Sequence, residues 1–329
     1  MEKVAQVLLA LLRHSLWGTP MEGIVAGLSE DQWVEVYSLA CRHTVQGVVF
    51  DAVKGLEKGC GPAPALGAKW LLETRFISQR YTLNKRVTEK MALIWKELGI
   101  NAVHLKGVRL ADMYPVPDHR TCGDIDWYFP EETGRLAANE WAKGVGQNLK
   151  RDSDGVTSYV YDGVVVEHHS LPFIPGDPVE DLVMLNLHIH KHAMVQGVGL
   201  RQICDLAVAY SHFHGEYDAE SLRSDLEKKK LLRWTDLLHH VLVEYIGLPE
   251  DLLPWPLEEK GRNACRPEDV EFFVDLVLKD GNFGLSKEHP RSGFWKRSVF
   301  FLKYSPQRFV KRWAGLIFGR LFRRSKIKQ

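Results

Sequence analysis

Cysteine pairs and long apolar runs are missing from this sequence of 329 residues. The cysteines are five, an odd number, and no two of them form a Cys-x-x-Cys pair. Such usage predicts a reducing compartment, the cytoplasm, and argues against a disulfide framework or a zinc knuckle. No apolar run reaches the roughly eighteen residues of a membrane span. The opening "MEKVAQVLLALLRHSLW" lacks a basic start and a small-residue cleavage site, so a core helix is expected there rather than a signal peptide.

Acidic residues are also missing from residues 291–329, which contain twelve Lys or Arg. Because the whole chain has a net charge of +1, the other 290 residues carry a net charge of −11. The sequence therefore has an acidic body and a basic tail.

In the tail, apolar residues recur at four- and five-residue steps: Phe309, Trp313, Ile317, Leu321 and Phe322. A helix with this pattern in residues 306–329 has three possible partners: the acidic body of its own chain, an anionic membrane surface, or RNA. Docking on the body, or disorder, is the simplest expectation, and peripheral contact with the inner face of the membrane is the next. Nucleic acid is the weakest of the three, because no RRM, KH or zinc-finger signature accompanies the basic residues.

Hydrophobic periodicity divides the chain into four regions. They are a helical region at 1–98, a strand-containing region at 99–177, a second helical region at 178–290, and the basic tail at 291–329. The middle region predicts strands at "INAVHL" and "DIDWYF", helices at "GVRLADMY" and "PEETGRLAANEWAKGVG", and a hairpin at "GVTSYVYDGVVVEHHS" that turns at Asp162-Gly163. The expected fold class is α+β, with a small mixed sheet flanked by helical regions.

Two aspartates interrupt the strand "DIDWYF", although aspartate is depleted in strands. Asp124 and Asp126 are two residues apart and so point to the same face. The second strand of the hairpin, "VVVEHHS", supplies another acid, Glu167. Three carboxylates on neighbouring strands repel one another unless a cation lies among them, and Mg²⁺ is a cation that carboxylates bind. The alternatives without a metal are a solvated strand end or a helix N-cap for the two aspartates, and a charged residue on an edge strand for Glu167.

Three motifs together, "LKG" at the end of a strand, "HRTCGDIDWYF" and "VVVEHHS", resemble the nucleotidyltransferase fold of the DNA polymerase β superfamily. More closely, they resemble a nucleotidyltransferase-like family of bacteria. The resemblance implies that Asp124 and Asp126 hold Mg²⁺, with two ions expected, and that Glu167 is the third ligand or the base. It also implies that Gly107 lies where backbone approaches the triphosphate of an NTP, with ATP as the default. The acceptor stays unknown and would be a small molecule, a protein or a sugar.

One position departs from the family pattern, because Val108 follows Gly107 where many members have Gly or Ser. A serine hydroxyl that would contact phosphate is therefore missing. Lys106 and Arg120 are plausible substitutes, since both side chains neutralise phosphate oxygens; they could equally be ion-pair partners of the same acids. The departure keeps open a second hypothesis, a nucleotide-binding or scaffold protein that has the fold without turnover.

The histidines suggest a third hypothesis, a metal-dependent hydrolase. His188, His190 and His192 alternate, and His168-His169 adjoin Glu167. On a strand, an HxHxH pattern could chelate zinc or iron. The apolar stripe of the surrounding residues predicts a helix instead, on which only His188 and His192 share a face.

Overall fold

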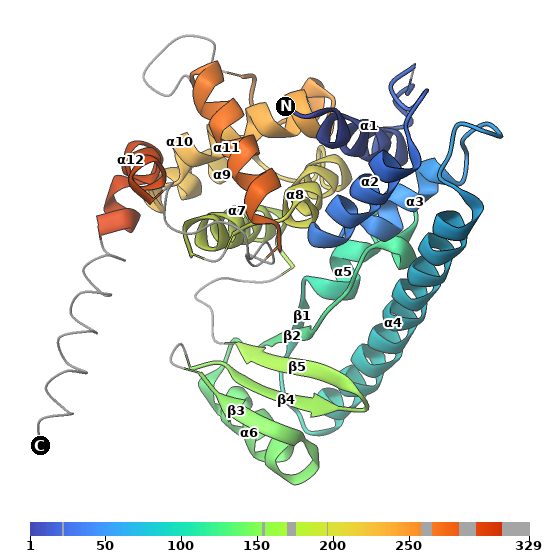
Figure 1. The fold of residues 1–329 in the computed structure, drawn as a ribbon. Helices are drawn as coiled ribbons and strands as arrows, with labels where there is room; N and C mark the ends of the chain where they lie inside the picture. The colour runs from blue at the N-terminus through green and yellow to red at the C-terminus, as the bar shows by residue number, and fades with distance from the viewer. Residues whose placement is uncertain are drawn as a thin grey trace, which may run out of the picture. The chain divides into compact units, whose positions relative to one another are not determined.

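The computed structural model describes residues 1–21, 23–152, 155–169, 176–195, 197–257, 265–282 and 294–310 (Figure 1). The chain divides into two compact units, one of Met1–Asp181 with Ser211–Phe213, the other of Leu182–Tyr210 with His214–Gln329. The four regions expected from the sequence remain a prediction about organisation within these units. In the described part of the chain, no helix has both the length and the apolar character needed to cross a membrane.

The first unit is α+β, as the sequence predicts. Its elements are α1 (Lys3–Trp17), α2 (Glu30–Arg42), α3 (Gln46–Val53), α4 (Pro64–Glu97), β1 (Val103–Leu105), α5 (Gly107–Ala111), η1 (Pro117–His119), β2 (Ile125–Tyr128), α6 (Glu132–Val145), β3 (Gln147–Arg151), β4 (Thr157–Tyr161) and β5 (Val164–His169). Both expected strands, both expected helices and the hairpin of the middle region are present. The sequence reasoning missed β3, whose residues are all exposed and carry no apolar alternation.

The sheet is mixed, with the strand order β1-β2-β5-β4-β3. Strands β2 and β5 are parallel, and the other neighbouring pairs are antiparallel. The β4–β5 hairpin turns at Asp162-Gly163, where both residues have positive φ, 49° and 78°. Two positive φ values are what a two-residue turn requires, and Asp-Gly is a preferred pair for it. The fold class predicted from the sequence is confirmed.

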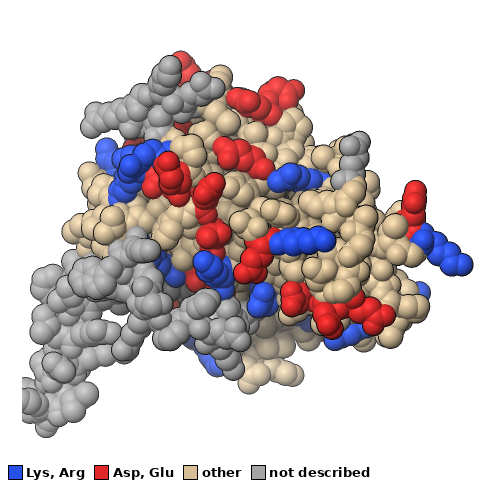
Figure 2. All heavy atoms as spheres, turned by 45° about the horizontal axis from the view of Figure 1, so that its top comes forward, with Lys and Arg blue, Asp and Glu red and all other residues tan. Residues whose placement is uncertain are grey.

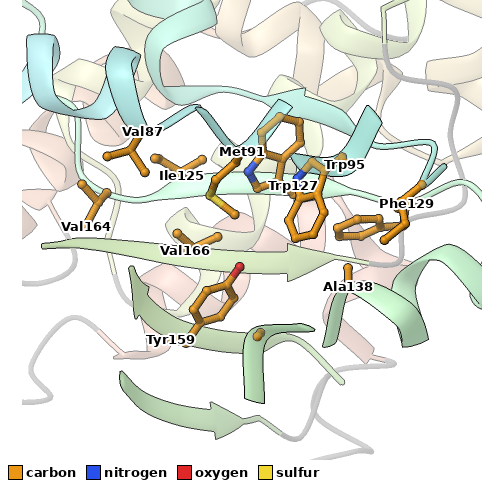
Figure 3. Packing of buried hydrophobic residues seen from close by; sticks show 12 residues of the cluster. Val87, Met91, Trp95, Ile125, Trp127, Phe129, Ala138, Tyr159, Val164 and Val166 are labelled. Carbon is orange, nitrogen blue, oxygen red and sulfur yellow. The ribbon is translucent and has the colours of Figure 1, made fainter. Parts of the chain in front are cut away.

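One face of the sheet is packed into a hydrophobic core (Figure 3). Trp95 on α4 lies at its centre, with ring centroids 6.2 Å from Trp127 and 5.8 Å from Phe129. The remaining core residues come from α4, the segment after it, α6 and the three central strands: Val87, Met91, Ile100, Ile125, Ala138, Ala142, Tyr159, Val164 and Val166. Alternate residues of β2 and β5 belong to this core, so the residues between them point to the opposite face.

The second unit is helical in the described residues. Its elements are α7 (Pro178–Val195), which begins in the first unit, then α8 (Leu200–His212), α9 (Ala219–Lys228), α10 (Leu232–Val241), η2 (Leu242–Ile246), η3 (Glu250–Leu252), α11 (Pro267–Asp280) and α12 (Phe294–Tyr304). Trp234 on α10 is fully buried against Phe273 and Phe301, with ring centroids 5.1 Å and 6.0 Å away.

Candidate active site

The face of the sheet opposite the core carries the acidic residues. Asp126 on β2 is the register partner of Glu167 on the parallel strand β5. Asp126 and Glu167 alternate with the core residues Ile125 and Val166, so both carboxylates lie on the outer face. Asp124 precedes β2 by one residue and is exposed. The sheet therefore places Asp126 and Glu167 side by side, and Asp124 lies just before the start of β2.

His169 joins the two strand carboxylates. Its Nε2 atom donates a hydrogen bond of 2.7 Å to Oδ1 of Asp126 and lies 3.4 Å from Oε2 of Glu167. One ligand atom from each of Asp126, Glu167 and His169 lies within 4.8 Å of the others. In the part of the chain that the structure describes, this is the one group of three His, Cys, Asp or Glu residues arranged as a metal could require.

The charges of this cluster shift the pKa of its members. For Asp126, burial acts to raise the pKa, but Lys106 and the hydrogen bond from His169 outweigh burial and hold it well below its usual range. For His169, burial acts to lower the pKa, and the hydrogen bonds to Asp126 and Glu167 overcome this and raise it to about 9. An imidazolium cation thus neutralises part of the acidic charge.

Asp124 has the opposite shift. Loss of surrounding water, although part of the residue is exposed, raises its pKa, and the charges of Asp126 and Glu167 raise it further. The negative charges of Asp126 and Glu167 therefore disfavour the ionised form of Asp124, which is the repulsion expected of neighbouring carboxylates.

A tight loop follows β1 beside the acids. Leu105 is the register partner of Asp126, so Lys106 and Gly107 begin next to that carboxylate. Gly107 has a φ of +46°, and a Cβ atom there would lie 3.4 Å from the carbonyl oxygen of Asp124. Lys106 itself has a φ of 45° and a ψ of −136°, a conformation that is costly for a residue with a side chain. The loop brings the backbone of Gly107 close to that of Asp124, and the approach of a triphosphate to Gly107 stays a prediction.

Arg120 lies beneath this loop and is only 2% exposed. Its Nη1 donates to the carbonyl oxygen of Gly107 at 3.1 Å and lies 3.4 Å from that of Thr121. From the sequence, Arg120 could bind phosphate or pair with the acids, and both stay predictions. Its guanidinium contacts backbone carbonyl oxygens of the loop, which it helps to hold in place.

Val108 is also turned into the protein. It is 6% exposed and packs with Tyr81, Ala111 and Cys122. A side chain at this position is directed into the small cluster behind the loop. The hydroxyl that many members of the superfamily present here is absent, and Lys106 remains the cation of the loop.

The other histidines fall into separate environments. His168 points into the core, where it lies 2.9 Å from the hydroxyl of Tyr159 and 2.8 Å from Oδ1 of Asn139, and burial lowers its pKa to about 3. On the helix α7, the rings of His188 and His192 are 4.3 Å apart, as expected for a pair one turn apart. His190 instead packs against Trp234, with ring centroids 5.1 Å apart. His188, His190 and His192 thus do not lie together at one point of α7, so they do not form a joint metal site for the hydrolase hypothesis.

Residues 29–181 match the profile of a protein family described as uncharacterised nucleotidyltransferase. The chain contains a nucleotidyltransferase-like domain. The match confirms the family resemblance and spans the whole sheet, the loop and every acid of the site. No curated protein and no solved structure matches the chain.

The donor set of the nucleotidyltransferase-like domain fits Mg²⁺. A hard divalent cation takes oxygen ligands. The carboxylates of Asp126 and Glu167 lie side by side here, and their charges raise the pKa of the nearby Asp124. His169 was not among the predicted site residues. The signal for it was present, because Glu167 and His169 are two residues apart on one strand and so share the acidic face.

Proposed function

We propose that the nucleotidyltransferase-like domain moves a nucleoside monophosphate from an NTP, ATP by default, to a hydroxyl group of an acceptor. The acceptor oxygen attacks the α-phosphorus, the bond to the bridging oxygen of the β-phosphate breaks, and pyrophosphate leaves. The observation that carries the proposal is the pairing of Asp126 with Glu167 across parallel strands, beside the loop of Gly107.

We assign metal binding and proton transfer to the acidic residues. Asp124, Asp126 and Glu167 would hold Mg²⁺, with two ions proposed, and the metal would supply positive charge that offsets the negative charge of the triphosphate. Glu167 orients the acceptor hydroxyl and takes its proton, because it is more accessible than Asp126: the side chains are 30% and 6% exposed. His169 keeps the carboxylate of Asp126 in place through its hydrogen bond.

The loop holds the triphosphate. The Cβ-free position at Gly107 lets phosphate approach the backbone, and the ammonium group of Lys106 supplies positive charge. Arg120 supports the carbonyl oxygen of Gly107 from below, so the loop keeps its shape when the anion binds.

The test uses two labels on the same nucleotide. The purified protein is incubated with Mg²⁺, a cell lysate and ATP labelled at either the α- or the γ-phosphate, followed by GTP, CTP and UTP. We expect an acceptor labelled from the α-phosphate, with the γ-label recovered in pyrophosphate. Transfer of the γ-label to the acceptor would indicate a kinase and overturn the proposal.

Val108 favours a second candidate, a protein that binds nucleotide without turnover. Its side chain lies in the cluster of Tyr81 and cannot offer a hydroxyl to phosphate. This candidate predicts that Mg²⁺–ATP raises thermal stability while neither label leaves the nucleotide with any lysate. A rise in stability accompanied by α-label transfer supports the first proposal instead.

A further inference from the structure

A row of paired residues crosses the outer face of the sheet, from the acids to the far edge. Glu167 on β5 is the register partner of Asp126 on one side and of Ser158 on β4 on the other. Ser158 is in turn the register partner of Lys150 on the edge strand β3. Residues paired in this way point to the same face of a sheet. A hydroxyl group and then an ammonium group therefore follow the two carboxylates on the outer face.

The side chains of Ser158 and Lys150 are free to bind a ligand. Ser158 is partly exposed and Lys150 is exposed. Among the described residues, the hydroxyl group of Ser158 has no hydrogen-bond partner and the ammonium group of Lys150 has no ion pair. The imidazolium group of His169 lies on the same face but is already hydrogen-bonded to Asp126. An ammonium group without an acid beside it can bind an anion from outside the protein.

The direction of the proposed transfer brings the acceptor over these two residues. In phosphoryl transfer the attacking oxygen and the leaving oxygen lie roughly in line, on opposite sides of the phosphorus. The triphosphate is proposed to bind at the loop of Lys106 and Gly107, which follows β1. In the sheet, β1 neighbours β2 on the side away from β5 and β4. The acceptor oxygen therefore approaches from the side of β5 and β4, where Glu167 takes its proton.

The spacing of the strands sets how far the acceptor extends over this face. Neighbouring strands lie about 4.8 Å apart, so Ser158 lies about 5 Å and Lys150 about 10 Å beyond Glu167 across the sheet. We propose that the acceptor is a hydroxyl compound with one phosphate or carboxylate group within about 10 Å of the accepting hydroxyl. Lys150 binds that anion, and Ser158 donates a hydrogen bond to the acceptor. The proposal rests on the function proposed above.

A single cation beyond the acids suits one anionic group. The carboxylates of Asp126 and Glu167 repel an anion, so the anionic group of the acceptor lies away from them, at Lys150. The repeated phosphates of a nucleic acid would need many cations. On the face drawn in Figure 2, Lys and Arg are interspersed with Asp and Glu, so that face has no broad basic field. The basic tail expected at 291–329 is described only at 294–310, and its contact with the acidic body, a membrane or RNA stays a prediction.

The first experiment tests the charge of the acceptor. The full chain is incubated with Mg²⁺, α-labelled ATP and a nuclease-treated cell lysate, before and after the lysate is passed over an anion-exchange resin. We expect the flow-through to support little transfer and the desalted eluate to restore it. Ultrafiltration of the labelled product then distinguishes a small phosphorylated or carboxylated molecule from an acidic segment of a protein.

The second experiment uses kinetics with the desalted eluate to assign the contact to Lys150. Lys150→Glu should raise the KM for the acceptor about tenfold or more and leave the KM for ATP unchanged, because repulsion replaces attraction. Lys150→Arg should keep the KM for the acceptor within a few-fold, and Ser158→Ala should raise it by a smaller factor than Lys150→Glu. Arg151→Glu is the matched control and should leave both constants unchanged. Arg151 is the next exposed residue of β3, but it pairs with Thr157, which is buried on the core side.

The outcomes separate the acceptor from the reaction. If the wild type transfers no α-label with the untreated lysate, the proposed function fails and the anionic acceptor fails with it. If the wild type transfers the label but the flow-through supports this fully, the anionic acceptor is ruled out while the reaction stands. An unchanged KM for the acceptor in Lys150→Glu would rule out the contact in the same way. Loss of the acceptor on nuclease treatment would identify a nucleic acid and contradict the proposal.

Discussion

Glu167 lies beside Asp126 in the register of two parallel strands, and His169 donates a hydrogen bond to one member of the pair while lying close to the other. The site therefore depends on the register of β5. A slip by one residue would turn Glu167 into the core and bring His168 out. His168 prevents this slip, because it is fully buried between Tyr159 and Asn139 on the core side.

Glu167→Gln should lower the rate of α-label transfer by about 10²- to 10⁴-fold, because the amide cannot take a proton from the acceptor. The free energy of unfolding should change by less than about 0.5 kcal/mol, since Glu167 is partly exposed and its contact with His169 is long. Rates and urea unfolding of the same preparations measure both effects. Glu131→Gln, an exposed acid near the end of β2, is the control and should retain full activity. Unchanged transfer by Glu167→Gln would assign the base to another residue.

Arg120→Lys should weaken the binding of Mg²⁺–ATP about tenfold and leave kcat at saturating ATP within a few-fold of the wild type. The ammonium group of lysine lacks the planar, fixed geometry with which the guanidinium contacts the carbonyl oxygens of Gly107 and Thr121, so the loop is held less firmly. The free energy of unfolding should fall by about 1–3 kcal/mol, because a buried carbonyl group loses its partner. Nucleotide titration and steady-state kinetics separate the two constants. A tenfold loss in kcat with unchanged affinity for Mg²⁺–ATP would mean that Arg120 acts on the reacting groups.

The strands, the hairpin and the acids could be predicted because their signals are local. Asp162-Gly163 specifies a turn by its backbone preferences, and the alternation of β2 and β5 fixes which residues share a face. The pairing of Asp126 with Glu167 on the face opposite the core followed from these two facts.

The contacts of Arg120 could not be predicted in the same way, because they include backbone carbonyl groups, whose positions cannot be inferred from residue types. The direction of Val108 is also set by packing against Tyr81, a residue of the distant helix α4. The strand β3 lacks any apolar alternation and is defined by its pairing with β4. These features depend on residues that are distant in the sequence, so the local sequence pattern could not predict them.

The second unit should lose stability below about pH 6.5 through its buried histidines. Burial lowers the pKa of both His190 and His239 to about 3, so each is neutral in the folded protein at a pH where it is protonated in the unfolded chain. Their stabilising effect is complete above the unfolded pKa and is lost as the pH falls from 6.5 towards 3. Each residue contributes a slope of about 1.4 kcal/mol per pH unit in that range.

His239→Gln tests this slope, because the amide can replace Nε2 in its hydrogen bond to Tyr210 and does not titrate. Urea unfolding between pH 7 and pH 4.5 gives the free energy of unfolding at each pH. For the variant, the slope of this free energy against pH should be smaller than that of the wild type by about 1.4 kcal/mol per pH unit. Leu238→Ala on the same helix is the control, since a buried cavity lowers the free energy of unfolding equally at each pH. The same slope in His239→Gln and the wild type would contradict the assignment.

Lys106 has a strained backbone conformation, and its ammonium group is proposed to bind phosphate. Two substitutions separate the effect of the strain from that of the charge. Lys106→Ala and Lys106→Gly both remove the ammonium group, so both should weaken the binding of Mg²⁺–ATP to the same extent. They differ in the backbone, because the φ of 45° and ψ of −136° suit glycine and strain alanine. The glycine variant should therefore be more stable than the alanine variant by about 1–3 kcal/mol in urea unfolding. If the two are equally stable, the loop is not strained in solution. If the glycine variant alone loses affinity, the rigidity of the loop rather than the charge of Lys106 holds the phosphates.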